Sequence, residues 1–349
     1  MRNRICGGLV AAIAAAGCNL AMAATEFRIV TASDKETAYT IGQDLAKYIG
    51  PAADISLDVV ATPGSASNIK ALRYDAGVKL AILQADVYQA FLDRAAGGSV
   101  EAASLIRPLR VILPLYNTEV HYIVRADSAL NYLHDIKSAR INGGLVGSGA
   151  ALTAHTMYRL MFNAPMPEIN ATFLSNEEAL VKLITDKSVD VVVVASGQPA
   201  PLIANMKPEA QKFIKLLKFD PDHPSAKAAM KVYTPATLRA ASYPNLLSGD
   251  FTSISVGSYL VTYDYNLKST VDYMTRFARA LCQNLGTLQA EGHPKWREVE
   301  LAQPALPPGW SYFPPTSREL KACRSGNPGS AVKPNRKCSA EERILGLCN

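Results

Sequence analysis

Short apolar runs alternate with amphipathic helical segments along most of this 349-residue chain. The segment after the first run has a helical pattern, because Ile41, Leu45 and Ile49 recur four residues apart. The predicted strands are 27–32, 55–59, 79–84, 109–116, 120–126, 171–175, 189–196 and 252–261, and the predicted helices are 37–49, 67–74, 149–162 and 176–187. Strands that alternate with helices indicate an α/β protein with a parallel, helix-flanked sheet.

Residues 1–23 have the layout of a secretory signal peptide. Arg2 and Arg4 precede an apolar run of small residues, and Ala21-Met22-Ala23 supplies a cleavage site. The run is shorter than the roughly 20 residues that span a bilayer. We therefore expect an exported, periplasmic protein. A lipid anchor at Cys18 is the alternative, because Ala15-Ala16-Gly17-Cys18 resembles a lipobox.

The composition is that of a globular protein, with 48% apolar and 19% charged residues. It excludes collagen, coiled coil and disorder, and the length suggests two domains. The net charge of +6 comes from the two ends of the chain. Arg2 and Arg4 lie in the leader, and residues 316–349 hold seven Lys or Arg against three Glu. Residues 24–315 are formally neutral, so we do not expect them to bind nucleic acid.

Four cysteines remain once the leader is removed, and three of them lie close to the C-terminus. They are Cys282, Cys323, Cys338 and Cys348. In an oxidising compartment they predict two disulfides that pin the polar segment 316–349, with three connectivities open. A zinc site is the alternative, but no C-x₂-C pair supports one, so we expect no metal.

Four loops at predicted strand ends carry small, hydroxyl and amide residues. They are 62–68, 84–86, 143–149 and 196–199. Ligands of parallel α/β sheets bind at the carboxyl ends of strands, and two of these loops open helices whose free N–H groups can hold an anion. The alternative is that these residues only cap helices and form turns.

Several motifs follow one another in a recognisable order. One motif, G-G-T-Y-Y-P-I-G, aligns with residues 35–42, and its last six positions are Thr37-Ala38-Tyr39-Thr40-Ile41-Gly42. A second motif, T-x-G-S-x-x-N, aligns with residues 62–68. Further matches are Leu83-Gln84-Ala85-Asp86, Val120-His121, Arg125-Ala126-Asp127-Ser128, Asp135-Ile136-Lys137, Gly147-Ser148-Gly149, Val189-Asp190, Gly197-Gln198-Pro199 and Ser242-Tyr243-Pro244. Over residues 27–271 the chain resembles the TAXI family of TRAP-transporter solute-binding proteins.

The resemblance implies an α/β, two-lobed periplasmic-binding-protein type II fold, in which the chain crosses between lobes twice. The first lobe would comprise 24–123 and 254–315 and the second 124–253, with 316–349 as a disulfide-pinned basic tail. The implied function is that of a monomeric extracytoplasmic receptor. It would bind a small organic anion, such as glutamate, 2-oxoglutarate or another dicarboxylate, and deliver it to a TRAP-type permease.

The resemblance also implies a set of ligand contacts. The contacts carried over from the family motifs are Thr37, Tyr39, Ser65, Asn68, Gln84, Ser148 and Gly149, with Gln198 and Tyr243 further out. Asp86 either binds a ligand amine or caps a helix. Lys35 and Glu36 replace the family's Gly pair. We therefore hypothesise that Lys35 takes part in recognising ligand charge, the alternative being a solvated loop charge.

Catalytic motifs are missing from the sequence. Ser148 and Ser196 lack the G-x-S-x-G context, the five histidines show no H-x-x-x-H or H-x-H spacing, and no lysine follows the glycine loop. We expect no catalytic residue, no cofactor and no enzymatic activity. The alternative function is that of an exported interaction or structural protein, with or without a lipid anchor at Cys18, whose basic tail engages a partner or an anionic surface.

Overall fold

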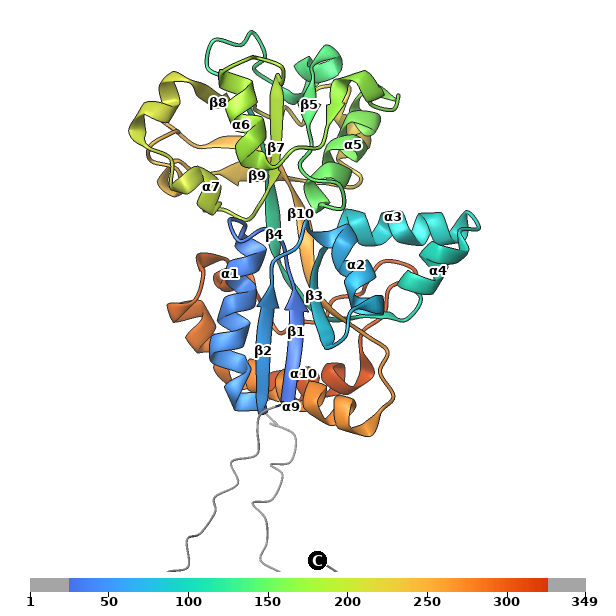
Figure 1. Ribbon diagram of the computed structural model, residues 1–349. Helices are drawn as coiled ribbons and strands as arrows, with labels where there is room; N and C mark the ends of the chain where they lie inside the picture. The colour runs from blue at the N-terminus through green and yellow to red at the C-terminus, as the bar shows by residue number, and fades with distance from the viewer. Residues whose placement is uncertain (1–24, 326–349) are drawn as a thin grey trace, which may run out of the picture.

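Two long antiparallel strands, β4 (Leu109–Arg125) and β10 (Phe251–Tyr263), run from one lobe into the other (Figure 1). The computed structural model describes residues 25–325. The leader, Cys18, Cys338, Cys348 and the rest of 326–349 therefore lie outside the described residues. At one end β10 pairs with β3 (Val78–Gln84), and at the other end β4 pairs with β7 (Val191–Ala195).

The first lobe holds both ends of the described chain. Its other elements are β1 (Thr25–Val30), α1 (Thr37–Asp44) continued by η1 (Leu45–Ile49), η2 (Pro51–Ala53), β2 (Ile55–Val60), α2 (Ser65–Tyr74), α3 (Ala85–Ala96), α4 (Val100–Ile106), α9 (Lys268–Glu291), η7 (Pro294–Glu298) and α10 (Pro314–Arg324). Leu80 and Ile82 pack toward α1 and α9, whereas Ala81 and Leu83 pack toward α2, α3 and α4. Helices therefore cover both faces of the first-lobe sheet.

The second lobe repeats this layered arrangement. Its elements are η3 (Leu133–Ser138), β5 (Ile141–Asn142), α5 (Gly149–Phe162), η4 (Glu168–Asn170), β6 (Ala171–Thr172), α6 (Asn176–Ile184), α7 (Pro201–Ala204), η5 (Pro208–Lys212), β8 (Ile214–Leu216), α8 (Ala226–Ala229), β9 (Thr234–Leu238) and η6 (Ala240–Ser242), besides β7. Val191 and Val193 pack with α5, and Val192 and Val194 pack with α6. The apolar run of β7 is thus buried on both faces, as its sequence predicts.

Hydrogen bonds join the strands into one sheet of order β2-β1-β3-β10-β4-β7-β5-β6, with β8 on β4 and β9 on β10. The outer pairs β1/β2, β1/β3, β5/β6 and β5/β7 are parallel, but β10 runs antiparallel to β3 and β4, and β4 runs antiparallel to β7. The two-lobed α/β fold with two connections is confirmed. The expectation of a wholly parallel sheet is wrong at the centre, where the connecting strands lie.

The two strands predicted at 109–116 and 120–126 form the single strand β4. The intervening Asn117-Thr118-Glu119 is polar and reads as a turn. These residues stay extended because each of them has a partner on β10: Gly257, Val256 and Ser255, respectively. The pairing supports a crossing between lobes in this part of both strands. The limits of the lobes stay a prediction.

A disulfide between Cys282 and Cys323 ties α9 to α10, with a Cα–Cα distance of 6.2 Å. This confirms one of the two expected disulfides and fixes the start of segment 316–349 to the first lobe. Within residues 25–325 no helix has the length and apolarity needed to cross a membrane, and no cluster of His, Cys, Asp or Glu suits a metal ion.

Replacing both cysteines by serine (Cys282→Ser with Cys323→Ser) should lower the free energy of unfolding by about 2–4 kcal/mol, because the bond constrains the unfolded chain. Its partners lie 41 residues apart. Urea unfolding measures the difference. Cys323→Ser alone should have about the same effect, since either change breaks the same bond. Unchanged stability in both variants would contradict the structural role of this disulfide.

Candidate functional site

A small cavity lies between the two lobes, and residues predicted from the sequence line it. Ser65 and Gln84 enter from the first lobe and Gly149 from the second. The remaining lining residues are Thr31, Ala32, Glu36, Ala38, Gly64, Ile82, Leu83, Tyr116, Thr118, Ala150, Ala195, Ser196 and Ser258. Its volume is about 30 Å³, which is room for one or two waters. A larger ligand therefore requires the lobes to move apart.

A second cavity of about 40 Å³ shares Glu36 and Ala150 with the first. Its other lining residues are Ser33, Pro63, Gly144, Leu145, Ser148, Ser175, Asn176 and Glu177. The two cavities therefore flank the same glutamate and the same first turn of α5.

The starts of α2 and α5 meet across the lobes. Backbone N–H groups of Ala66 and Ser67 both donate to the carbonyl of Gly147 at 3.1 Å. Gly64 precedes α2 with φ 133°, and a Cβ there would lie 3.1 Å from the backbone nitrogen of Gly149. Glycine at 64 therefore serves both the backbone conformation and the close approach. The Ser148 side chain caps α5 by accepting from the Ala151 N–H at 3.0 Å.

Gln84 and Gly149 form the tightest contact of the cavity. Gln84 ends β3, and Ser65 Oγ accepts a hydrogen bond from its backbone N–H at 3.1 Å. Its side-chain Oε1 is buried and has no hydrogen-bond partner among residues 25–325. A Cβ on Gly149 would overlap this oxygen and come within 3.2 Å of Ser65 Oγ. A side chain at 149 would therefore displace the Gln84 amide from its place in the closed arrangement.

Glu36 is the acidic residue that the two cavities share. Burial is the main reason that its pKa is raised to about 8, and the nearby Glu177 carboxylate raises it further. The neighbouring Lys35 lines neither cavity; its Nζ lies 2.7 Å from Glu177 Oε1 on α6. In this arrangement Lys35 makes an interlobe ion pair at the mouth of the cleft, so its expected part in recognising ligand charge stays a hypothesis.

Thr37, Asn68 and Asp86 use their side chains to hold the protein together. Thr37 Oγ1 donates to the Gly197 carbonyl of the other lobe at 2.6 Å. Asn68 Nδ2 donates to the carbonyl of Ile82 at 2.9 Å. Asp86 Oδ2 accepts from hydroxyls of the second lobe, Thr153 at 2.6 Å and Tyr233 at 3.0 Å. These four contacts support structural roles for the three predicted residues.

The predicted contacts Tyr39, Gln198 and Tyr243 also lie outside the linings of the two cavities. The Tyr243 hydroxyl lies 2.7 Å from His121 Nε2 and accepts from the Ala200 N–H at 3.0 Å. Burial lowers the pKa of His121 to about 4, so this histidine is neutral at pH 7. Tyr243 therefore helps to fix the start of α7, because its hydroxyl binds the N–H of the residue that precedes the helix.

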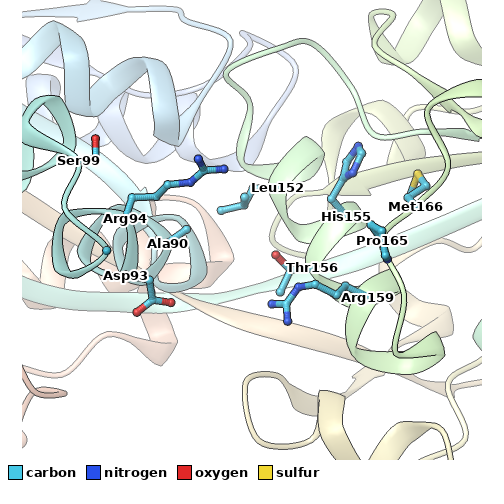
Figure 2. Close-up of a pocket in the computed structure, with 11 residues that line it drawn as sticks. Ala90, Asp93, Arg94, Ser99, Leu152, His155, Thr156, Arg159, Pro165 and Met166 are labelled. Carbon is cyan, nitrogen blue, oxygen red and sulfur yellow. The ribbon is translucent and has the colours of Figure 1, made fainter.

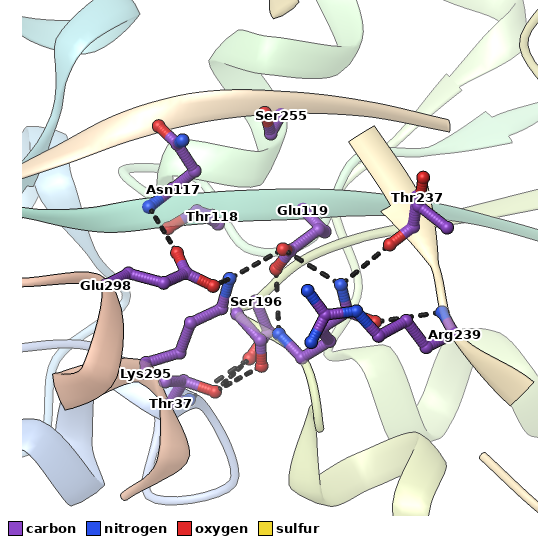
Figure 3. Close-up of polar contacts among 12 residues, drawn as sticks. Thr37, Asn117, Thr118, Glu119, Ser196, Thr237, Arg239, Ser255, Lys295 and Glu298 are labelled. Atoms are coloured by element: carbon purple, nitrogen blue, oxygen red, sulfur yellow. Dashed lines mark hydrogen bonds and ion pairs between the residues drawn. The ribbon is translucent and has the colours of Figure 1, made fainter. Parts of the chain in front are cut away.

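Gln198 belongs to a buried cluster where β4 passes between the lobes, drawn in Figure 3. Glu119 accepts from the Gln198 backbone N–H at 2.8 Å, and Lys295 Nζ of η7 lies 2.6 Å from its other oxygen. Lys295 Nζ also contacts Glu298 at 2.7 Å. We call Glu119, Lys295, Glu298 and Gln198 the hinge cluster. It joins η7 of the first lobe to the loop that follows β7 in the second lobe, and no sequence motif predicted it.

A wider hollow of about 610 Å³ lies on the flank between α3 and α5, and none of the predicted contacts lines it. Figure 2 shows the side chains of Arg94 and Arg159 extending into it from the two helices. Because the residues singled out by the sequence gather elsewhere, we take the interlobe cavity as the candidate site.

Gly149→Ala should destabilise the closed arrangement by about 1–3 kcal/mol, the usual cost of overfilling a packed site. We expect small-angle X-ray scattering to show a larger radius of gyration, with unchanged far-ultraviolet circular dichroism. Gly286→Ala is the matched control, because a Cβ at that helical position meets nothing within 4 Å. A radius of gyration equal to that of the unchanged protein would contradict the proposed contact.

Lys295→Met should destabilise the protein by about 3–5 kcal/mol, because it leaves the Glu119 carboxylate buried without its cation. Lys295 is only 1% exposed. Denaturant unfolding measures the loss. The double variant with Glu119→Gln should recover part of it, since the uncompensated charge is then gone. A loss below about 1 kcal/mol for the single variant would refute the buried ion pair.

Comparison with solved structures finds distant likenesses. The binding-protein component of an ABC phosphonate transporter from Pseudomonas aeruginosa is 15% identical, with 93% of each chain covered and a TM-score of 0.47. The periplasmic binding protein BugD is 12% identical, covering 87% of this chain and 95% of that one, with a TM-score of 0.48. The alkanesulfonate-binding protein SsuA from Xanthomonas axonopodis pv. citri, bound to MOPS, is 16% identical, covering 85% and 83%, with a TM-score of 0.43. Scores below 0.5 carry no conclusion about this chain's ligand.

The family comparison is decisive, because it extends over most of the chain and includes the site. A model described as the NMT1-like family matches residues 29–306. This range contains both connecting strands, the starts of α2 and α5, and the hinge cluster. The chain therefore belongs to the NMT1-like family.

Proposed function

We propose that this protein is an extracytoplasmic solute receptor that closes its two lobes around a small polar ligand. The observation that carries the proposal is the enclosed cavity between the lobes, to which both lobes contribute backbone and side chains. Small-molecule sites are typically concave, placed between domains, and supplied with a few convergent polar groups.

The connection between the lobes supports a closing motion. β4 and β10 both pass from one lobe to the other, and the contacts between the lobes elsewhere include polar ones, such as Thr37 with Gly197, Asp86 with Thr153 and Lys35 with Glu177. A ligand that touches both lobes binds better to a form closed around it than to an open form, and so shifts the equilibrium by its differential affinity. Opening would also supply the volume that the closed cavity lacks.

The chemistry of the site supports binding of an anionic group without a metal. The first turns of α2 and α5 meet at the cavity. The Gly147 carbonyl takes the N–H groups of Ala66 and Ser67, which leaves those of Ser65, Gly149 and Ala150 for a ligand. Among the described residues, the cavity lining contains serine hydroxyls but no histidine, cysteine or lysine that could activate them. This supports binding and release of a ligand and gives no support to catalysis.

The resemblance to the TAXI proteins supports a TRAP-type permease as the partner, with the protein working in the periplasm after removal of residues 1–23. In this proposal the permease receives ligand from the closed, loaded form. The monomeric state is part of the same proposal, because one chain already supplies both walls of the cavity.

A thermal-shift panel tests the receptor function. A ligand at about 100 times its Kd stabilises the folded protein by roughly 2.7 kcal/mol, which raises Tm by several degrees. The panel should contain dicarboxylates, amino acids, aromatic acids, sulfonates and phosphates, applied to protein refolded from denaturant so that no co-purified ligand remains.

Gln84→Ala should lose any shift that the panel finds, whereas Gly286→Ala should keep it. If no compound of the panel shifts Tm, the receptor proposal fails. The interaction function of the basic tail would then become the better hypothesis.

A further inference from the structure

The walls of the two adjoining cavities offer hydrogen-bond acceptors that have no donors. Gln84 Oε1 is buried without a partner among residues 25–325, and so is Asn176 Oδ1 in the second cavity. Glu36 is half-buried and lines both cavities, and no described residue donates to its carboxylate or forms an ion pair with it. Buried polar groups are rarely left unsatisfied, and those that are require an explanation.

Nothing in the cavity walls compensates the Glu36 carboxylate. The linings of both cavities lack Lys, Arg and His. Lys35 is adjacent in sequence, but its Nζ is paired with Glu177 at 2.7 Å. The cation that would satisfy these acceptors is therefore not supplied by the cavity walls.

N–H donors lie beside these acceptors, in the walls of the same two cavities. They are the first-turn N–H groups of α5 at Gly149 and Ala150, with the Ser65 N–H at the start of α2. Helix N-termini favour negative charge. The cleft thus sets N–H groups that suit an anion next to acceptors that suit a protonated nitrogen.

We propose that Glu36 sets the charge specificity of the cleft, which selects a small zwitterion with a protonated nitrogen against Glu36 and an anionic group at the starts of α2 and α5. The inference rests on the receptor function proposed above. Of the ligands that the resemblance implies, it keeps glutamate and excludes dicarboxylates without an amine, because a carboxylate beside Glu36 would set like charges and acceptors against one another.

Binding of this kind is coupled to a proton. With its pKa raised to about 8, Glu36 of the unliganded protein is mostly neutral at pH 7. The charged groups around it are Glu177 on α6 and Lys35 on its own segment. The phenol of Tyr116 on β4 stays neutral, because burial raises its pKa above the usual range. A ligand cation requires ionised Glu36, so affinity should rise toward pH 8, by up to about tenfold per pH unit.

Titration calorimetry with matched compounds tests the inference. The pairs are aspartate with succinate, glutamate with glutarate, and 4-aminobutyrate with butyrate, so that the members differ only in the amine. We expect the amine member of at least one pair to bind at least tenfold tighter. Its affinity should increase between pH 6 and pH 8.

Glu36→Gln keeps the size of the side chain and removes its charge. In this variant the preference for the amine member and the pH dependence should both disappear. Glu209→Gln, at an exposed position on η5, is the matched control and should behave like the unchanged protein. Should Glu36→Gln fail to fold, the pair preference and pH profile of the unchanged protein still decide the matter.

The possible failures differ from one another. If succinate or glutarate binds as tightly as its amine partner, or if only sulfonates or phosphates bind, the specificity inference is overturned and the receptor function stands. If affinity for the amine member is the same in Glu36→Gln, the role of Glu36 is overturned. If the unchanged protein binds no compound at all, both proposals fail.

Discussion

The antiparallel pairing of β4 with β10 is the interaction on which the other parts of this molecule depend. It runs from Tyr263 opposite Leu109 to Ile254 opposite Val120, and so continues from the core of one lobe into the core of the other. At one end β10 presents its free edge to β3, and at the other end β4 presents its edge to β7. The sheet of each lobe is therefore built onto a strand that continues into the other lobe. The cleft lies between the part of this strand pair that β3 joins and the part that β7 joins.

Polar groups lie on and beside β4 and β10 where these strands pass between the two lobe cores. Thr118 and Ser258 hydroxyls meet at 2.7 Å between the strands, and Glu119 follows with Lys295 from η7. A buried ion pair is weak evidence for added stability, because desolvation offsets most of the attraction, but losing one partner is costly. The hinge cluster therefore fixes the positions of η7 and of the loop after β7 relative to β4. Gln198 takes part with its backbone N–H, which donates to Glu119, and with its side-chain amide, which donates to Glu119 and to the Thr237 carbonyl.

Charge is distributed unevenly between the cleft and the rest of the chain. The net excess of +6 comes from the leader and from residues 316–349, so it has no bearing on the ligand. The cleft itself carries Glu36 and, at its rim, Glu177, whose carboxylate is paired with the Lys35 ammonium.

The sequence by itself determined the local elements and three residues of the cavity. Helix 149–162 has the predicted limits, the alternating and apolar runs became strands, and Ser65, Gln84 and Gly149 meet as the motif order implied. This works because periodicity and turn chemistry act within a few residues of chain. Only the tertiary structure decided the rest. Asn117-Thr118-Glu119 stays extended because β10 lies beside it, and Lys295 meets Glu119 across 176 residues of chain. These long-range contacts depend on how the whole lobes pack, and a pattern within a few residues of chain does not predict them.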